Sequence, residues 1–170
     1  MAADSFATRK FGSVFRGGFK KIREPVYIAE AGQYPGFIFS LRNGNSDAYL
    51  FNQADYSGSA YMATGILDCK PGHAIDTVYT VGDFCEYFAI GDDVDVAIYV
   101  INATPAPSYN IGDIIVASTT DGYGQKWATG LLNTSYDYLA SPLCKIGKVS
   151  MEMRAGSTSD AKIITVNLSG

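Results

Sequence analysis

The sequence predicts an all-β protein, a sandwich or barrel preceded by an N-terminal arm. Twelve tyrosines and nine phenylalanines among 170 residues make the composition rich in strand-forming side chains. From residue 25 onward, short apolar runs are interrupted by Gly, Pro, Asn or Asp roughly every ten residues, as in sandwiches and barrels. An apolar residue, Gly and Asp recur together at Gly82, Gly91 and Gly112. Gly followed by Asp favours a turn, so this phrase marks places where the chain reverses.

The expected strands follow one another along the body. Asn43 and Gly44 form a strong hairpin signal between the second and third of them. The stretch 94–101 begins with polar alternation and becomes wholly apolar, which predicts a strand that runs from the rim into the core. The expected strands are 26–29, 37–41, 49–52, 61–67, 77–81, 84–88, 94–101, 114–118, 126–129, 144–153 and 163–168.

Two stretches of the body are expected to be loops. Residues 102–110 contain Pro105 and Pro107, which exclude a central strand. Residues 130–141, from Gly130 to Ser141, carry Tyr136 and Tyr138 as candidate contact residues.

Residues 1–24 differ from the body in charge. They carry six basic and two acidic residues, a net charge of +4, whereas residues 25–170 carry seven basic and fifteen acidic residues, a net charge of −8. Such a split indicates that the two parts meet different surroundings. Phe11, Phe15 and Phe19 are spaced as on a helix, but the neighbouring glycines oppose a stable isolated helix. The arm therefore either orders on a partner or packs on its own body.

The three cysteines, Cys69, Cys85 and Cys144, form no C-x-x-C pair. Their spacing favours reduced thiols over a disulfide framework or a zinc site. The N-terminus has no secretory profile, and no apolar run approaches the length that spans a bilayer. We therefore expect synthesis and folding in a reducing cytoplasm.

The sequence contains few residues that could carry chemistry. His73 follows Cys69 by four residues, but Pro71 and Gly72 between them predict a turn rather than a catalytic pair. No phosphate-binding glycine motif is present. We therefore expect no enzymatic activity and no cofactor.

A cluster of carboxylates follows Gly91. Asp92, Asp93 and Asp95 could offer oxygen ligands to Ca²⁺, but they lack the alternating spacing and distal Glu of an EF-hand loop. A solvated acidic turn is the favoured interpretation, and no metal is expected.

Several turn phrases recur in a fixed order between residues 30 and 168. They are AGQYPGF at 31–37, DTVYTVGD at 76–83, IGDDV at 90–94, YNIGDIIV at 109–116, TDGYG at 120–124 and IGKV at 146–149. In this order they resemble the small β-rich decoration proteins, also called cement or head-stabilising proteins, of tailed bacteriophages.

The resemblance implies a single small β-barrel or β-tulip-like body (residues 25–170) on the outside of a capsid. Such a virion protein bridges major capsid protein subunits and stabilises the shell, as a dimer or trimer, without an active site. It touches neither nucleic acid nor a membrane, and an N-terminal arm (residues 1–24) grips the shell. The arm's aromatic and basic residues are the candidate partner-binding set: Phe6, Arg9, Lys10, Phe11, Phe15, Arg16, Phe19, Lys20, Lys21 and Arg23.

Two other functions remain open at the level of sequence. A phage tail-tube or connector subunit is also β-rich, but it would assemble into rings by itself. A carbohydrate-binding module could use the tyrosine-rich surface and Trp127 to stack on sugars. If the protein is a decoration protein, as the resemblance implies, we expect it on the exterior of a virion.

Overall fold

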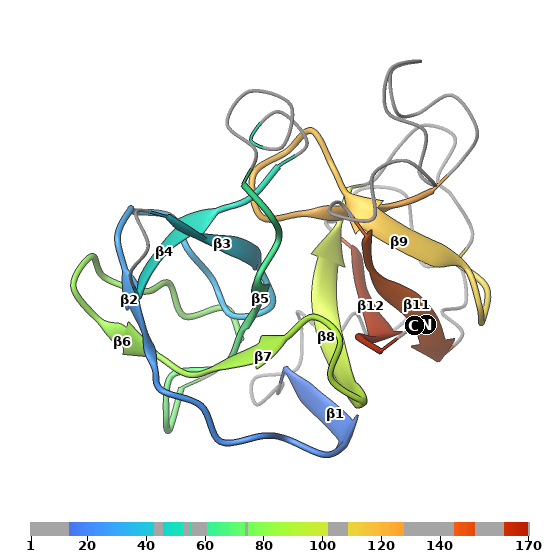
Figure 1. The fold of residues 1–170 in the computed structure, drawn as a ribbon, viewed down its shortest axis with the longest axis horizontal. Coiled ribbons are helices and arrows are strands. Elements are labelled where there is room, and N and C mark those ends of the chain that lie inside the picture. The colour runs from blue at the N-terminus through green and yellow to red at the C-terminus, as the bar shows by residue number, and fades with distance from the viewer. Residues whose placement is uncertain are drawn as a thin grey trace, which may run out of the picture.

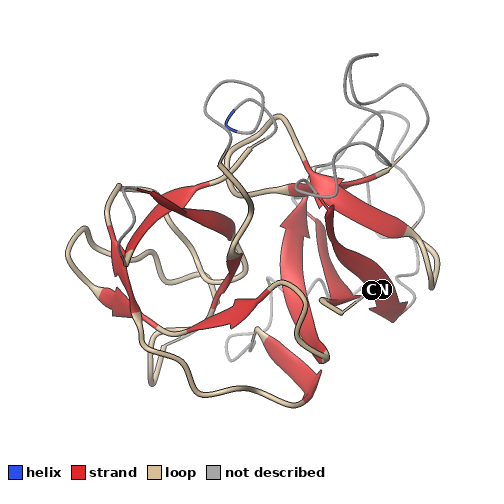
Figure 2. Cartoon of the chain, in the orientation of Figure 1, coloured by secondary structure: helices blue, strands red, loops and turns tan. Residues whose placement is uncertain are grey.

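The computed structural model describes residues 14–42, 46–52, 55, 61–73, 75–101, 109–127, 145–151 and 162–169. Within these ranges the chain forms twelve strands joined by turns (Figure 2). The strands form two six-stranded sheets. The prediction of an all-β, barrel-like protein is confirmed.

Five strands of the first sheet close into a barrel. Each strand hydrogen-bonds to the next, and β12 returns to β8 along the whole of its length, from Lys162 opposite Val100 to Asn167 opposite Asp95. We call this ring the closed barrel. Its strands, in order around the ring, are β8 (Val94–Val100), β10 (Gly124–Lys126), β9 (Ile114–Ala117), β11 (Lys145–Met151) and β12 (Lys162–Asn167).

The second sheet is nearly closed and lies beside the closed barrel (Figure 1). Its two end strands, β6 and β7, follow each other in the chain and are separated by Glu86 alone. The order across this sheet is β6 (Phe84–Cys85), β2 (Val26–Ile28), β4 (Asp47–Leu50), β3 (Ile38–Arg42), β5 (Gly65–Leu67) and β7 (Tyr87–Ala89).

One strand precedes the expected body. β1 (Phe15–Gly18) pairs antiparallel with the first half of β8, with Phe15 opposite Val96 and Gly18 opposite Val94. β10 joins β8 at Val100, beyond the end of β1. β1 is therefore added to the first sheet without being part of its closed ring.

The turn between β9 and β10 joins the two sheets. The backbone of Gly122 accepts a hydrogen bond from the Ile38 amide at 2.8 Å. Beside it, the Phe37 ring lies 5.1 Å from Tyr99 and 5.0 Å from Tyr123 between ring centroids. Buried apolar residues of both sheets belong to one continuous cluster. The closed barrel and the second sheet therefore form one packed unit.

Most of the expected strands are present, with shifted ends. β8 is buried except at Asp95, as the polar start of its sequence predicts. The expected strand 77–81 is wrong, since this stretch is irregular and its Tyr79 amide donates to the Gln33 carbonyl. β10 begins two residues before the expected strand 126–129, of which residues 128 and 129 lie outside the described residues. Residues 102–108 and 130–141, expected to be loops, lie outside the described residues.

All three Gly-Asp phrases lie at turns. Gly82, Gly91 and Gly112 have φ angles of 94°, 98° and 90°, in the region where glycine is unstrained. β3 and β4 pair antiparallel as the Asn43-Gly44 signal predicts, although residues 43–45 themselves lie outside the described residues.

Candidate functional site

The chain from β1 to the start of β2 crosses the outside of the molecule. We call residues 15–25 the strap. In Figure 1 the strap begins beside β8 and runs along the lower edge, past β7 and β6, to β2. It contacts the first sheet through β8 and the second through Asp68 and Glu86. It contains six of the ten residues predicted to bind a partner, and the other four, Phe6, Arg9, Lys10 and Phe11, lie outside the described residues.

Lys20 anchors the middle of the strap to the second sheet. Its Nζ lies 2.6 Å from Asp68 Oδ2 and 2.5 Å from Glu86 Oε2. The same ammonium lies 5.3 Å from the centroid of the Phe88 ring, within the range of a cation–π contact. Although burial lowers the pKa of Lys20, its hydrogen bonds to the two carboxylates outweigh that effect and raise the pKa.

Asp92 anchors the end of the strap. Its carboxylate, on a residue only 6% exposed, accepts from Lys21 Nζ at 2.9 Å and from Arg23 Nη2 at 2.9 Å to each oxygen. Burial raises the pKa of this carboxyl, but the hydrogen bonds from the two cations outweigh burial and hold the pKa below its usual value. The strap thus supplies the positive charge that a buried carboxylate requires.

The apolar side chains of the strap have different surroundings. Phe15 stacks on Phe88 with 6.1 Å between ring centroids, so it covers the second sheet. Phe19 is 79% exposed and Ile22 is fully exposed. The strap therefore directs Lys20, Lys21 and Arg23 toward the body and the side chains of Phe19 and Ile22 toward solvent.

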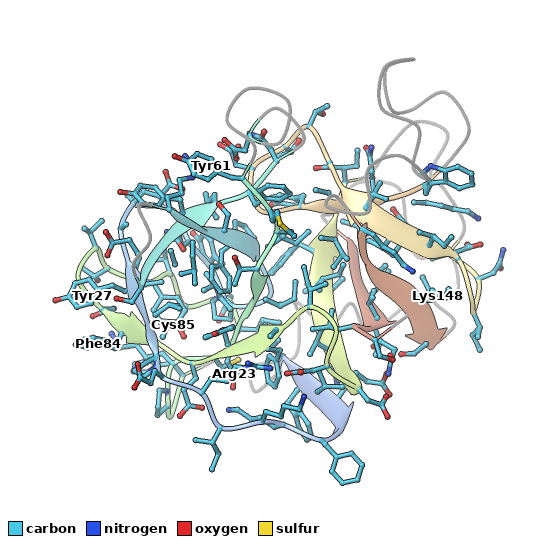
Figure 3. All side chains as sticks on the ribbon, viewed as in Figure 1. Arg23, Tyr27, Tyr61, Phe84, Cys85 and Lys148 are labelled. Atoms are coloured by element: carbon cyan, nitrogen blue, oxygen red, sulfur yellow. The ribbon has the colours of Figure 1, made fainter. Side chains whose placement is uncertain are left out.

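A second group of exposed apolar side chains lies where the strap enters β2. Tyr27 and Phe84 are cross-strand partners of β2 and β6, and their rings meet edge to face at 4.5 Å. Val81, in the turn before β6, is also exposed. Figure 3 labels Tyr27 and Phe84 at the same edge of the second sheet, with Arg23 farther along the strap. No local pattern in the sequence indicates this group of side chains, because strand pairing brings it together.

The acidic turn does not gather its carboxylates around one point. Asp92 binds Lys21 and Arg23, whereas the Asn167 side-chain amide donates to Asp93 at 3.1 Å and to Asp95 at 3.0 Å. Among the residues that the structure describes, no group of three or more His, Cys, Asp or Glu side chains could hold a metal ion.

His73 lies exposed in a turn in which its amide donates to the Lys70 carbonyl at 2.9 Å. Cys69 and Cys85 are thiols that form no disulfide. Burial raises the pKa of Cys69, and raises that of Cys85 to about 12. A thiol with a raised pKa is a poor nucleophile at neutral pH, so the pattern is that of structural cysteines.

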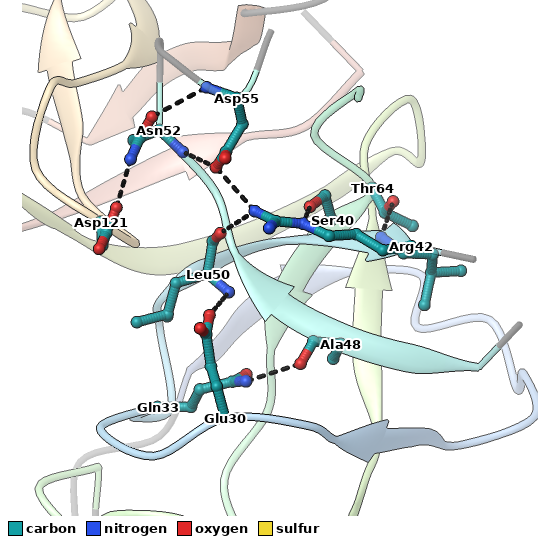
Figure 4. A network of polar contacts seen from close by, with 11 residues as sticks. Glu30, Gln33, Ser40, Arg42, Ala48, Leu50, Asn52, Asp55, Thr64 and Asp121 are labelled. Atoms are coloured by element: carbon teal, nitrogen blue, oxygen red, sulfur yellow. Dashed lines mark hydrogen bonds and ion pairs between the residues drawn. The ribbon is translucent and has the colours of Figure 1, made fainter. Parts of the chain in front are cut away.

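Arg42, at the end of β3, lies in a network of polar contacts with Asp55 and Leu50 (Figure 4). The Arg42 guanidinium lies over Tyr49 and Tyr61, 4.9 and 5.0 Å from their ring centroids. It also pairs with Asp55 at 2.9 Å and donates to the Leu50 carbonyl at 3.0 Å. One face of each tyrosine is therefore covered by the chain's own arginine, which leaves less aromatic surface for stacking on sugars.

The comparisons with known proteins identify no family. No protein-family model matches the chain, and no curated protein matches it. The described ranges contain no helix that is long and apolar enough to cross a bilayer. The class that the fold and this site define is thus a β-barrel protein with a charge-anchored strap that presents apolar side chains.

Proposed function

We propose that this protein binds the outside of a phage capsid and stabilises the shell by bridging major capsid protein subunits. The observation that carries the proposal is the arrangement of the strap, in which Phe19 and Ile22 are exposed while Lys20, Lys21 and Arg23 are bound to the body. The ordered turn phrases that resemble decoration proteins supply the class of partner.

The anchored strap favours binding to another protein. Large apolar side chains that become buried at the centre of an interface dominate its affinity. Since the strap is held by ion pairs at both Lys20 and Arg23, little conformational entropy would be lost when Phe19 and Ile22 are buried. Many weakly bound copies on one capsid would then stabilise it together.

The basic residues take two roles in this proposal. Lys20, Lys21 and Arg23 position the strap, because their charges are already opposed by carboxylates of the same chain. Direct attraction to an acidic capsid surface belongs to Arg9 and Lys10. Binding is therefore expected to weaken only moderately with added salt.

The test is to mix the purified protein with undecorated capsids and to image the particles. A variant with Phe19→Ser and Ile22→Ser should bind at least about tenfold more weakly, since each buried side chain of this size contributes roughly 1.5–3 kcal/mol. Ile111→Ser is the matched control, because Ile111 is similarly exposed, at 67%, but lies in the turn before β9. Equal occupancy by the double variant and the wild type would refute this role of the strap.

A tail-tube or connector subunit is the main competing function. It would form rings without any capsid, whereas a decoration protein stays a small oligomer until the shell is present. Light scattering of the purified protein distinguishes the two, and self-assembly into rings would exclude the proposal.

A further inference from the structure

β1 is set apart from the other strands of its sheet by its pairing. β8, β10, β9, β11 and β12 close their ring without it, and the second sheet does not include it. Loss of β1 would therefore open neither ring. We propose that the strap is exchangeable, so that the strap of one copy occupies the strap's place on a second copy and joins the two chains. This inference is independent of the proposed capsid function.

The body carries a defined acceptor surface for the strap. It consists of the first half of β8, the carboxylates of Asp68, Glu86 and Asp92, and the Phe88 ring. Each ion pair between them joins residues at least 48 positions apart in the sequence. Because the strap's anchoring contacts are made with the body, the same contacts form when the strap comes from another chain.

Charge complementarity identifies the occupant as a second copy. The acceptor surface presents three carboxylates, and the strap presents three cations at the spacing that meets them, Lys20, Lys21 and Arg23. A different chain would need the same cations and an extended segment to pair with β8. A second copy of this chain has both the three cations and the extended segment, because its sequence is the same.

The junction between the strap and β2 suits a hinge. Glu24 and Pro25 are both exposed, and they separate Arg23 from the buried Val26. Proline restricts the residue before it to extended backbone, so the chain between the strap and β2 is extended in the closed and in the exchanged arrangement alike. In the exchanged arrangement the strap would be redirected by backbone rotation at these two exposed residues.

Exchange should depend on concentration. The closed monomer and the exchanged dimer share their contacts, so the main cost of the dimer is that of association. A strap tethered to its own body has an effective concentration there in the mM range. Exchange should become prominent as the concentration of the protein approaches that value. Copies that are held close together would exchange at lower bulk concentrations.

The decisive experiment mixes two variants that each carry one added cysteine besides the three native ones. Gly17 pairs with Asp95, and a Cβ at Gly17 would lie 3.6 Å from Asp95 Oδ2, so Gly17→Cys and Asp95→Cys place two thiols side by side. Diamide oxidises the two thiols to a disulfide and takes up both protons and both electrons. When each chain carries one substitution only, the 17–95 disulfide can form only between chains. Tryptic peptide mapping distinguishes the 17–95 disulfide from disulfides that involve native cysteines.

The control replaces Asp95→Cys with Thr119→Cys, an exposed site between β9 and β10. We expect the 17–95 link to rise with protein concentration and to exceed the 17–119 link at least tenfold. Equal yields of the two links would overturn the proposal. Light scattering on the wild type gives a second test that needs no variant, and a protein that stays monomeric to about 1 mM also overturns it.

Discussion

The three Gly-Asp turns use the same residues in two ways. Asp83 and Asp113 accept hydrogen bonds from backbone amides of their own turns, at Thr80 and Asn110. Asp92 instead receives Lys21 and Arg23 from the strap. The aspartate of the Gly-Asp phrase thus stabilises its own turn at two sites, and at the third it anchors a segment that is distant in the sequence. The difference depends on what lies across from each turn.

Substitution of Asp92→Asn should loosen the strap. A hydrogen bond to a charged group contributes roughly 1.5–3 kcal/mol, so the strap should open at least about tenfold more often. Trypsin cleavage after Lys20, Lys21 and Arg23 measures this opening. Asp83→Asn is the matched control, because Asp83 binds Lys70 and Thr80 and contacts no strap residue in the described ion pairs. Equal cleavage of the two variants would contradict the anchoring role of Asp92.

Among the elements, the strap and the β9–β10 turn link the two sheets. The strap spans them, since β1 pairs with β8 of the first sheet and Lys20 forms ion pairs with Asp68 and Glu86 beside strands of the second. The turn inserts Gly122 against Phe37 and hydrogen-bonds to Ile38. Neither element is strongly apolar in sequence. Each links the two sheets because of the residues that it contacts on them.

Substitution of Gly122→Ala should destabilise the junction. Gly122 has φ +77°, and an added Cβ would lie 2.6 Å from the Phe37 ring. Gly112→Ala is the control, since Gly112 has φ +90° but nothing within 4 Å of the added Cβ. The backbone effect alone costs about 1–2 kcal/mol, and Gly122→Ala should cost more. Urea unfolding measures both, and equal midpoints would show that the close approach to Phe37 has no energetic weight.

Acid should release the strap. The pKa of Asp92 is lower in the folded protein than its ordinary value of 3.8, so this carboxylate stabilises the fold above about pH 3.8. That stabilisation is lost as the pH falls through the lowered pKa. Hydrogen exchange of residues 15–23 should therefore accelerate in strong acid in the wild type. In Asp92→Asn the contribution of this carboxyl to the pH dependence should vanish, and an unchanged acid dependence would assign the effect to other groups.

At the scale of the molecule, the closed barrel and the nearly closed second sheet share one core. A strand that belongs to a closed ring has partners on both edges, and closure removes exposed edges that would otherwise pair with other chains. Within the first sheet, β1 is joined to β8 alone in the described pairings. The strap is thus the element whose removal disturbs the rings least.

Deletion of residues 1–24 should leave a folded body of lower stability. Both rings keep their pairings, but Asp92 loses its cations and Phe88 loses the cover of Phe15. Circular dichroism should retain the β signal, and urea unfolding should stay cooperative with a lower midpoint. A non-cooperative transition would show that the strap is required for folding. The deleted protein should also fail to bind capsids.

Much of the fold follows from local sequence. The Gly-Asp phrases predict the three turns, and the apolar run at 94–101 predicts β8, because turn and burial signals are carried by neighbouring residues. The strand ends are less predictable, as β10 and the irregular stretch 77–81 show, since pairing partners decide them. Phe15 and Phe19 could be singled out as candidates, but their spacing suggested a helix face where the structure has β1 and an extended strap.

By itself, the sequence determined the all-β class, the turns and the charge contrast between residues 1–24 and the body. Only the tertiary structure decided that Lys20, Lys21 and Arg23 serve the chain's own Asp68, Glu86 and Asp92, and that Phe19 and Ile22 stay exposed. The physical reason is the range of the interactions. Turns depend on adjacent residues, whereas ion pairs and ring closure join segments dozens of residues apart and become defined only when both sheets have formed.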